Sequence, residues 1–274
     1  MRRFSHRFSR HITWIALMLT SFCSNRVVAG SFTASGSTLT IDLDVASQLV
    51  TVESTGTTYT FTLSGGATNS WTGTTSTSVS VSGDILTVTA TGLSTFGTIN
   101  ITDSQTGTKV TFASSGANAY SDHFNITLDN TPGAVSFSGS SSFSGSSAIN
   151  VTTSMYITFT LSSLTTADGN LTLDANMQSP SNDFAFSGIL VDNATVQITG
   201  TGILTMRGKG GSTGSASSYQ NRGIAVINGA QVMGGTTGTP TIEGRGYTGV
   251  SGTRQGQGVI VNSSGGTPIH ILIN

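Results

Sequence analysis

The sequence predicts an all-β protein built as a parallel β-solenoid, in which the chain winds into stacked coils, with an irregular β-rich cap at its N-terminal side. Three observations favour this fold: an asparagine motif that returns every 25 residues, a glycine-led motif that returns every 35, and few charged or helix-forming residues. Repeats of about 20 to 50 residues that carry short strands are typical of solenoids. An array of β-sandwiches is the alternative, because it too has short alternating strands at regular spacing.

The first repeat reads apolar-Asn-apolar-Thr and occurs as TINIT, HFNIT and AINVT. Its asparagines are Asn100, Asn125 and Asn150, and weaker echoes follow at Asn170 and Asn193. Because side chains alternate along a strand, the flanking Ile, Phe and Val residues point into the core and the asparagines point outward. We expect the outward amides to stack and hydrogen-bond along the solenoid axis. The triplets also match the N-glycosylation pattern, which a Thr-rich chain meets often by chance.

The second repeat begins with GILV, GIAV and GVIV, which start at Gly188, Gly223 and Gly258. The match continues downstream, since Ala-Thr-Val at 194–196 aligns with Ala-Gln-Val at 230–232. Each unit also holds a polar, Gly-rich stretch, STGSASSYQNR in one and VSGTRQGQ in the next. Insertions in solenoids usually form loops on one face, so we expect these stretches to lie together.

The first 29 residues predict a secretory signal peptide. Basic residues precede an apolar run at Ile12–Cys23, and small or aliphatic residues lead up to Ala29. This run is short of the roughly 20 residues that span a bilayer, and no second long apolar run follows. We therefore expect a secreted or cell-surface chain, cleaved near Ala29, with no transmembrane segment. Cleavage also removes the only cysteine, so the mature chain forms no disulfide.

The mature sequence divides into two regions. Residues 30–97 alternate cleanly but do not keep the 25-residue step, so we expect irregular first coils or a β-rich cap over an open solenoid end. Residues 98–274 should form the coils. The last 35-residue unit starts at Gly258 and the sequence stops at Asn274, which predicts an incomplete last coil. We expect either truncation relative to longer relatives or self-association through this open C-terminal coil.

The segments NLTLDANM, SGILVDNATVQITGTGILTMRGKGG and NRGIAVINGAQV carry a family resemblance. Residues 98–274 resemble the glycine-rich coils of bacterial filamentous-haemagglutinin and autotransporter-passenger proteins. The resemblance implies a right-handed parallel β-helix displayed outside the cell, in adhesion or surface-layer roles. It is more specific to architecture than to activity.

Parallel β-helices also include polysaccharide-degrading enzymes, so a glycoside hydrolase or lyase is the alternative function. The best carboxylate pair is Asp129 and Asp174, each four residues after a repeat asparagine and two coils apart, which predicts a backbone separation near ~9.6 Å. Aspartates at solenoid corners more often accept backbone N–H groups. His123, beside Asp122, lacks a placed nucleophile. We therefore expect no enzymatic activity, no cofactor and no bound metal, since calcium-repeat aspartates and Cys/His clusters are missing.

The charges of the mature chain separate along the sequence. Residues 30–200 carry eleven acidic side chains and one lysine, whereas residues 201–274 carry five basic side chains and one glutamate. Exposed charge pairs contribute little to stability, about 0.2–1 kcal/mol each. The repeat alignment stacks one opposite-charge pair and one like-charge pair, Arg207 over Glu243 and Lys209 over Arg245.

The loops of the second repeat supply the predicted ligand-binding residues Tyr219, Arg222, Tyr247 and Arg254. Aromatic rings suit the faces of sugars, and guanidinium groups suit carboxylates or sulfates. We expect these loops to bind an anionic surface glycan or another cell-envelope component. A nucleic-acid partner is excluded, because the mature chain is net acidic and exported. The sequence thus predicts a non-enzymatic, adhesin-like surface protein.

Overall fold

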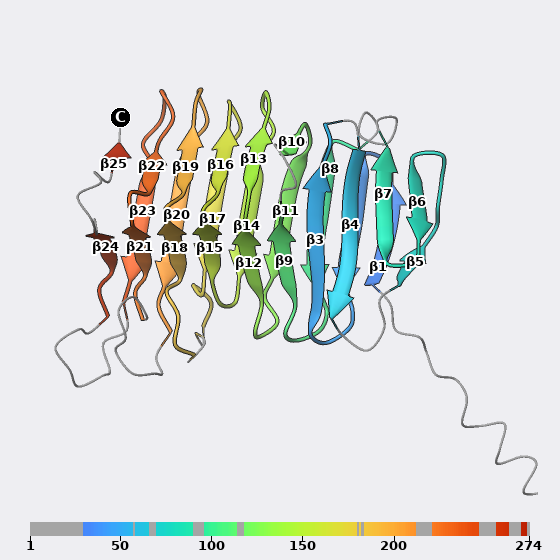
Figure 1. The fold of residues 1–274 in the computed structure, drawn as a ribbon, viewed down its shortest axis with the longest axis horizontal. Helices are drawn as coiled ribbons and strands as arrows, with labels where there is room; N and C mark the ends of the chain where they lie inside the picture. Colours follow the sequence, from blue (N-terminus) through green and yellow to red (C-terminus); the bar gives the residue numbers. More distant parts are fainter. Residues whose placement is uncertain are drawn as a thin grey trace, which may run out of the picture.

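The computed structural model describes residues 30–56, 58–65, 70–89, 96–113, 118–179, 181, 184–211, 221–246, 256–262 and 270–272. The predicted signal peptide at residues 1–29 lies outside these described residues. Within them the regular elements are strands, which form three sheets along the long axis of the molecule (Figure 1). We call them sheets A, B and C, in the order in which the chain visits them.

The strands of the three sheets have the following bounds. Sheet A contains β1 (Gly30–Ser35), β2 (Thr38–Leu43), β5 (Trp71–Gly73), β8 (Thr98–Asp103), β11 (His123–Leu128), β14 (Ile149–Thr153), β17 (Leu171–Ala175), β20 (Leu204–Lys209) and β23 (Thr241–Arg245). Sheet B contains β3 (Gln48–Ser54), β4 (Thr58–Gly65), β6 (Val79–Ser82), β7 (Ile85–Thr89), β9 (Lys109–Phe112), β12 (Ala134–Phe137), β15 (Ile157–Thr160), β18 (Ile189–Asp192), β21 (Ile224–Ile227) and β24 (Val259–Asn262). Sheet C contains β10 (Asn118–Tyr120), β13 (Ser140–Phe143), β16 (Ser163–Thr166), β19 (Thr195–Ile198), β22 (Gln231–Met233) and β25 (His270–Leu272).

From β8 onward the chain repeats one circuit, a strand in sheet A, then one in sheet B, then one in sheet C. Each strand pairs in parallel with its equivalents in the coils before and after it, as Figure 1 shows for the coils lying side by side. The predicted parallel β-solenoid is therefore confirmed. The β-sandwich alternative is wrong, because every pairing from β8 to β25 in the described part of the chain is parallel.

The N-terminal region differs in how its strands pair. The described antiparallel pairs, β1 with β2, β3 with β4, β4 with β7 and β6 with β7, all lie within residues 30–89. β2 and β3 also pair in parallel with β8 and β9, so this region continues directly into the coils. Trp71 is buried there, and its indole N–H donates to the carbonyl oxygens of Phe61 (3.0 Å) and Asp84 (2.8 Å).

Inward side chains form columns that run along the solenoid axis. The Ile, Phe and Val residues that flank the repeat asparagines are buried, as the alternation predicted. In sheet B the rings of Phe112, Phe137 and Phe159 stack, with centroids 4.8 Å and 4.6 Å apart and nearly parallel planes. The next coils place Val191 and Val226 in the same column. The core therefore changes from aromatic to aliphatic along the axis.

The glycines of the second repeat lie where sheet A approaches sheet B. Gly188, Gly223 and Gly258 are in register, which confirms the 35-residue step. A Cβ atom on Gly223 would lie 2.5 Å from the carbonyl oxygen of Gly258 and closer still to the amide nitrogen of Arg245. One on Gly188 would lie 2.6 Å from the amide nitrogen of Lys209. These positions exclude a side chain, because the backbones of two sheets meet there.

The last coil leaves core positions open to solvent. Val259 and Val261 in β24 are register partners of the buried Ile224 and Val226, yet they are 40% and 48% exposed. The predicted self-association through this end of the solenoid stays a prediction.

Candidate ligand-binding edge

The asparagine repeat forms a hydrogen-bonded ladder on the outer face of sheet A. Asn100, Asn125 and Asn150 are direct register partners on β8, β11 and β14. The side-chain amide of Asn125 donates to Oδ1 of Asn100 (3.0 Å), and that of Asn150 donates to Oδ1 of Asn125 (2.9 Å). The expected ladder is confirmed. Because these amides bond to one another within the sheet, the repeat has a structural role.

The ladder stops at Asn150, and the echo at Asn170 does not join it. Asn150 pairs with Thr172 on β17, so this coil step is three residues shorter than the preceding one. Asn170 therefore lies two residues before the register position, and its Oδ1 accepts the backbone N–H of Ile203 (2.9 Å). The second echo, Asn193, lies in the turn between β18 and β19 with a positive φ of 47°.

This shorter coil also separates the two aspartates that the sequence placed in one column. Asp174 lies opposite Thr152, whereas Asp129 follows β11 and continues the register toward Ser154. The expectation of two carboxylates stacked in one column is therefore wrong. The reason is that Asn170, unlike Asn100, Asn125 and Asn150, does not occupy the register position of the ladder.

Asp174 is already bound by an arginine from the next coil. Nε of Arg207 donates to Oδ1 of Asp174 (2.7 Å), and Nη2 of Arg207 contacts Oδ2. This two-point pair raises the pKa of the Arg207 guanidinium above its ordinary value. Paired in this way, the Asp174 carboxylate anchors neighbouring strands of sheet A. Asp129, by contrast, is exposed and directly follows the last residue of β11.

His123 and its neighbours do not form a catalytic relay. Nδ1 of His123 accepts the backbone N–H of Ala148 (3.0 Å). The hydroxyl of Ser121 lies 3.3 Å from that of Tyr59, and the Ser121 N–H donates to the same Tyr59 oxygen (2.8 Å). Asp122 is buried, and burial raises the pKa of its carboxyl. These contacts join the region of β4 to the corner that leads into β11.

The connections from sheet A to sheet B form one edge of the solenoid, and they lengthen along the chain. In the earlier coils they are short, at residues 129–133 and 154–156. In the later coils they span residues 176–188, 210–223 and 246–258. We call these three connections the long-loop edge. Insertions that gather on one side of a solenoid are often its binding face.

All four predicted ligand-binding residues belong to this edge. Tyr219 and Arg222 are in the second long connection, and Tyr247 and Arg254 are in the third. Tyr219, Tyr247 and Arg254 lie outside the described residues. Arg222 is described, and it differs from the expectation of a surface guanidinium, because only 8% of it is exposed. Its carbonyl oxygen accepts the N–H of Gly188 (2.9 Å), which holds the chain against the neighbouring coil.

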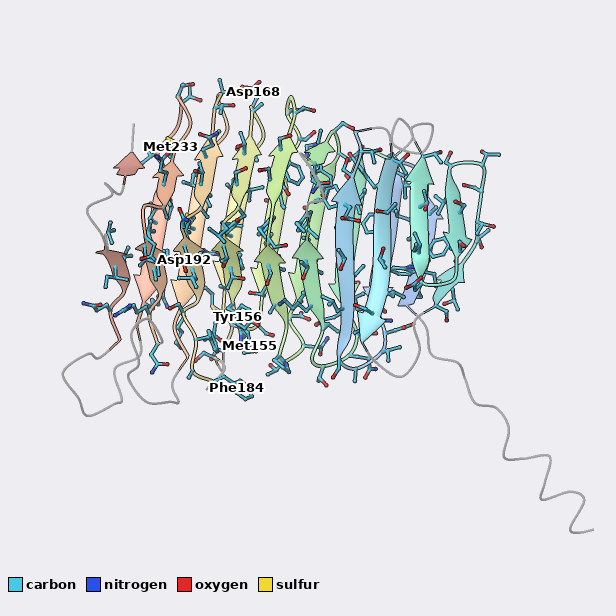
Figure 2. The ribbon with its side chains drawn as sticks, in the orientation of Figure 1. Met155, Tyr156, Asp168, Phe184, Asp192 and Met233 are labelled. Atoms are coloured by element: carbon cyan, nitrogen blue, oxygen red, sulfur yellow. The ribbon has the colours of Figure 1, made fainter. Side chains whose placement is uncertain are left out.

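Aromatic side chains that the sequence analysis missed lie on the same edge. Phe184 is 54% exposed, and Tyr156 is partly exposed at the start of β15. Figure 2 shows Met155, Tyr156 and Phe184 gathered at one side of the coils, opposite Asp168 and Met233. The ring of Phe186 packs beneath, with its centroid 6.0 Å from that of Tyr156. We call Tyr156, Phe184 and Phe186 the aromatic ledge.

Charged side chains occupy the outer face of sheet A beside this edge. The register on β20 and β23 places Arg207 opposite Glu243 and Lys209 opposite Arg245, as the repeat alignment predicted. Glu243 is bound along its own strand, since Nε of Arg245 donates to its Oε1 (2.7 Å). The two carboxylates of this area are thus paired with the two arginines, and Lys209 adds a further positive charge.

Searches against protein-family models, curated proteins and solved structures found no match for this chain. In the described part of the chain, His, Cys, Asp and Glu side chains do not gather in groups of three or more that could hold a metal ion. No helix among those residues has the length and hydropathy to cross a membrane. The functional assignment therefore depends on the geometry of the edge itself.

Proposed function

We propose that this protein is an exported, non-enzymatic β-solenoid of the surface or adhesin type, which binds a glycan through its long-loop edge. The main support for the proposal is the aromatic ledge, where Phe184 is 54% exposed and lies two residues before Phe186, whose ring packs against that of Tyr156. Large apolar side chains gathered on a protein surface commonly mark a binding site. Tyr156 adds a ring with a polar hydroxyl tip, which suits a partly hydrated ligand such as a sugar.

The position of the ledge supports the same proposal. The long connections all join sheet A to sheet B, at one edge of an otherwise regular scaffold, where their length does not disturb the strand ladders. The ring of Phe186 packs against that of Tyr156, and the backbone N–H groups of Gly211 and Asn221 both donate to the carbonyl oxygen of Phe186 (3.1 Å and 3.0 Å), which holds the chain in place two residues after Phe184. A platform held by neighbouring coils loses little conformational freedom when a ligand binds.

The test is retention of the purified protein on immobilised neutral and acidic polysaccharides. Phe184→Ala should weaken retention, because it removes the exposed ring without opening the core. Ile203→Ala is the matched control, since Ile203 is also an exposed apolar residue but precedes β20 on a different edge. Equal retention of Phe184→Ala and the parent protein on every glycan would refute the proposal. Release of shorter saccharides during the assay would instead favour the polysaccharide-degrading alternative.

A further inference from the structure

We infer that Lys209 and Arg245 form a subsite for the carboxylate of an acidic sugar, at the border between sheet A and the long-loop edge. The inference rests on the proposed glycan-binding function and names the ligand chemistry that this edge selects. Both side chains point outward, and they are direct register partners on adjacent strands. We call them the basic pair.

The basic pair places two like charges opposite each other on adjacent strands. Adjacent strands lie about 4.8 Å apart, and like charges directly opposite each other destabilise a sheet. Of the carboxylates nearby, Asp174 binds Arg207, and Glu243 binds one member of the pair, Arg245, along its own strand, which offsets part of this repulsion and leaves Lys209 as the added positive charge. One carboxylate placed between Lys209 and Arg245 would replace this repulsion with two attractive contacts.

Both members of the pair have the donors to hold such a group. Glu243 contacts only Nε and Nη2 of Arg245, and a guanidinium carries five N–H donors. The side chain of Arg245 is 60% exposed, so a ligand reaches it from solvent. Lys209 adds three donors on a flexible stem, which suits an oxyanion whose exact position varies along a polymer.

The backbone connects the basic pair to the aromatic ledge. The chain leaves β20 after Lys209, and the N–H of Gly210 donates to the carbonyl oxygen of Arg245 (2.9 Å). The N–H of the following Gly211 donates to the carbonyl oxygen of Phe186 (3.1 Å). Two glycines therefore join the two features. The arrangement fits a uronic-acid polymer, whose rings contact the ledge and whose carboxylate contacts the pair.

The experiment compares the affinities of polygalacturonate, neutral dextran and dextran sulfate for the full-length protein at low ionic strength. Lys209→Gln should weaken polygalacturonate binding about threefold to fivefold, as expected for a partly exposed ion pair, and leave dextran binding unchanged. Lys209→Arg should retain the parent affinity, and Lys109→Gln, on sheet B, is the matched control. Added salt should reduce the difference between parent and Lys209→Gln.

The outcomes separate this inference from the proposed function. Equal polygalacturonate affinity of Lys209→Gln and the parent overturns the subsite, even if Phe184→Ala weakens every glycan and so supports the ledge. A loss restricted to dextran sulfate overturns the carboxylate assignment. Conversely, a selective loss of polygalacturonate in Lys209→Gln, with Phe184→Ala without effect, supports the subsite and refutes the ledge. Circular dichroism of both variants checks that the fold is intact.

Discussion

The coils from β8 to β16 and the coils from β17 to β24 fill the same cross-section in different ways. The earlier coils use large aromatic side chains, with Phe112, Phe137 and Phe159 stacked face to face. The later coils place valines in that column and let the backbones of sheets A and B meet at glycines. Interiors are close-packed throughout, so a smaller core side chain requires a closer backbone. The 25-residue asparagine repeat belongs to the coils with aromatic cores, and the 35-residue glycine repeat belongs to the coils with close backbone contacts.

The outer faces differ in the same direction. On the earlier coils the outward column carries the uncharged asparagine ladder and short connections between sheets A and B. On the later coils the outward positions carry two charge pairs, Asp174 with Arg207 and Glu243 with Arg245, and the connections become long. Apart from Tyr156, which precedes β15, the features from which we infer binding therefore belong to the later coils, and the earlier coils act as a scaffold.

Removing an aromatic ring from the earlier coils should have the largest effect. Phe137→Ala should lower the free energy of unfolding by about 3–5 kcal/mol, because it leaves a cavity between two stacked rings. Phe137→Val copies the side chain used at Val191 in the later coils, and it should still destabilise, because valine fills less of the space between the rings of Phe112 and Phe159. Urea titration measures both. If the valine variant is as stable as the parent, then smaller core side chains do not require the backbones of sheets A and B to lie closer together.

Adding a methyl group where the backbones meet should have the next largest effect. Gly223→Ala places a Cβ atom against the backbones of Arg245 and Gly258, which cannot shift without breaking ladder hydrogen bonds. We expect a loss of about 3 kcal/mol, at the upper end of typical overpacking costs. Gly97→Ala is the control, because a Cβ atom there meets open space. Thermal unfolding of the two variants distinguishes a tight contact from a general cost of replacing glycine.

The strand register was predictable from the sequence wherever side chains alternate strictly. The ladder from Asn100 to Asn150 and the step from Gly188 to Gly223 follow from this alternation, because a slip of one residue would expose the core. The shortened coil before Thr172 was not predictable. The segment GNLTL resembles the repeat motif in sequence, but its asparagine lies two residues before the register position.

The sequence predicted where the candidate site lies, but it did not predict which side chains face solvent there. Long polar insertions identified the edge, but whether a loop residue faces solvent depends on contacts with neighbouring coils. Arg222 is buried for this reason, while Phe184, an apolar residue within a polar loop, is exposed. A lone phenylalanine in such a loop is a signal that sequence reasoning could have used.

The turn between sheets B and C also differs between the earlier and the later coils. Leu161, Asn193 and Asn228 occupy equivalent turns between sheets B and C, and all have positive φ values. Asparagine tolerates this conformation, whereas other side chains pay about 1–2 kcal/mol. Leu161 is also 72% exposed, so its side chain gains little from packing. Leu161→Asn should therefore raise the free energy of unfolding by about 1 kcal/mol, measured by urea titration, with exposed Thr160→Asn as the control.

The last prediction concerns pH, and it separates the two halves by how they accommodate acidic side chains. The later coils pair Asp174 with Arg207, whereas the earlier coils bury Asp122 beside the Tyr59 hydroxyl and the exposed His123. Burial raises the pKa of Asp122 above its ordinary value of 3.8, so the folded chain holds this proton more tightly than the unfolded chain. The stability contributed by this proton is fully present below pH 3.8 and is lost as the pH rises through the folded pKa.

Asp122→Asn imitates the protonated carboxyl and should remove this loss. We expect the variant to be more stable than the parent at pH 7, with the difference shrinking as the pH falls through the raised folded pKa of Asp122 and the parent itself becomes protonated. Buried Asp103, whose pKa is also raised, keeps its own pH dependence in both proteins. Urea midpoints at several pH values measure the effect, with partly exposed Asp84→Asn as the control. A variant less stable than the parent at pH 7 would mean that the Asp122 carboxylate makes favourable contacts that outweigh its burial.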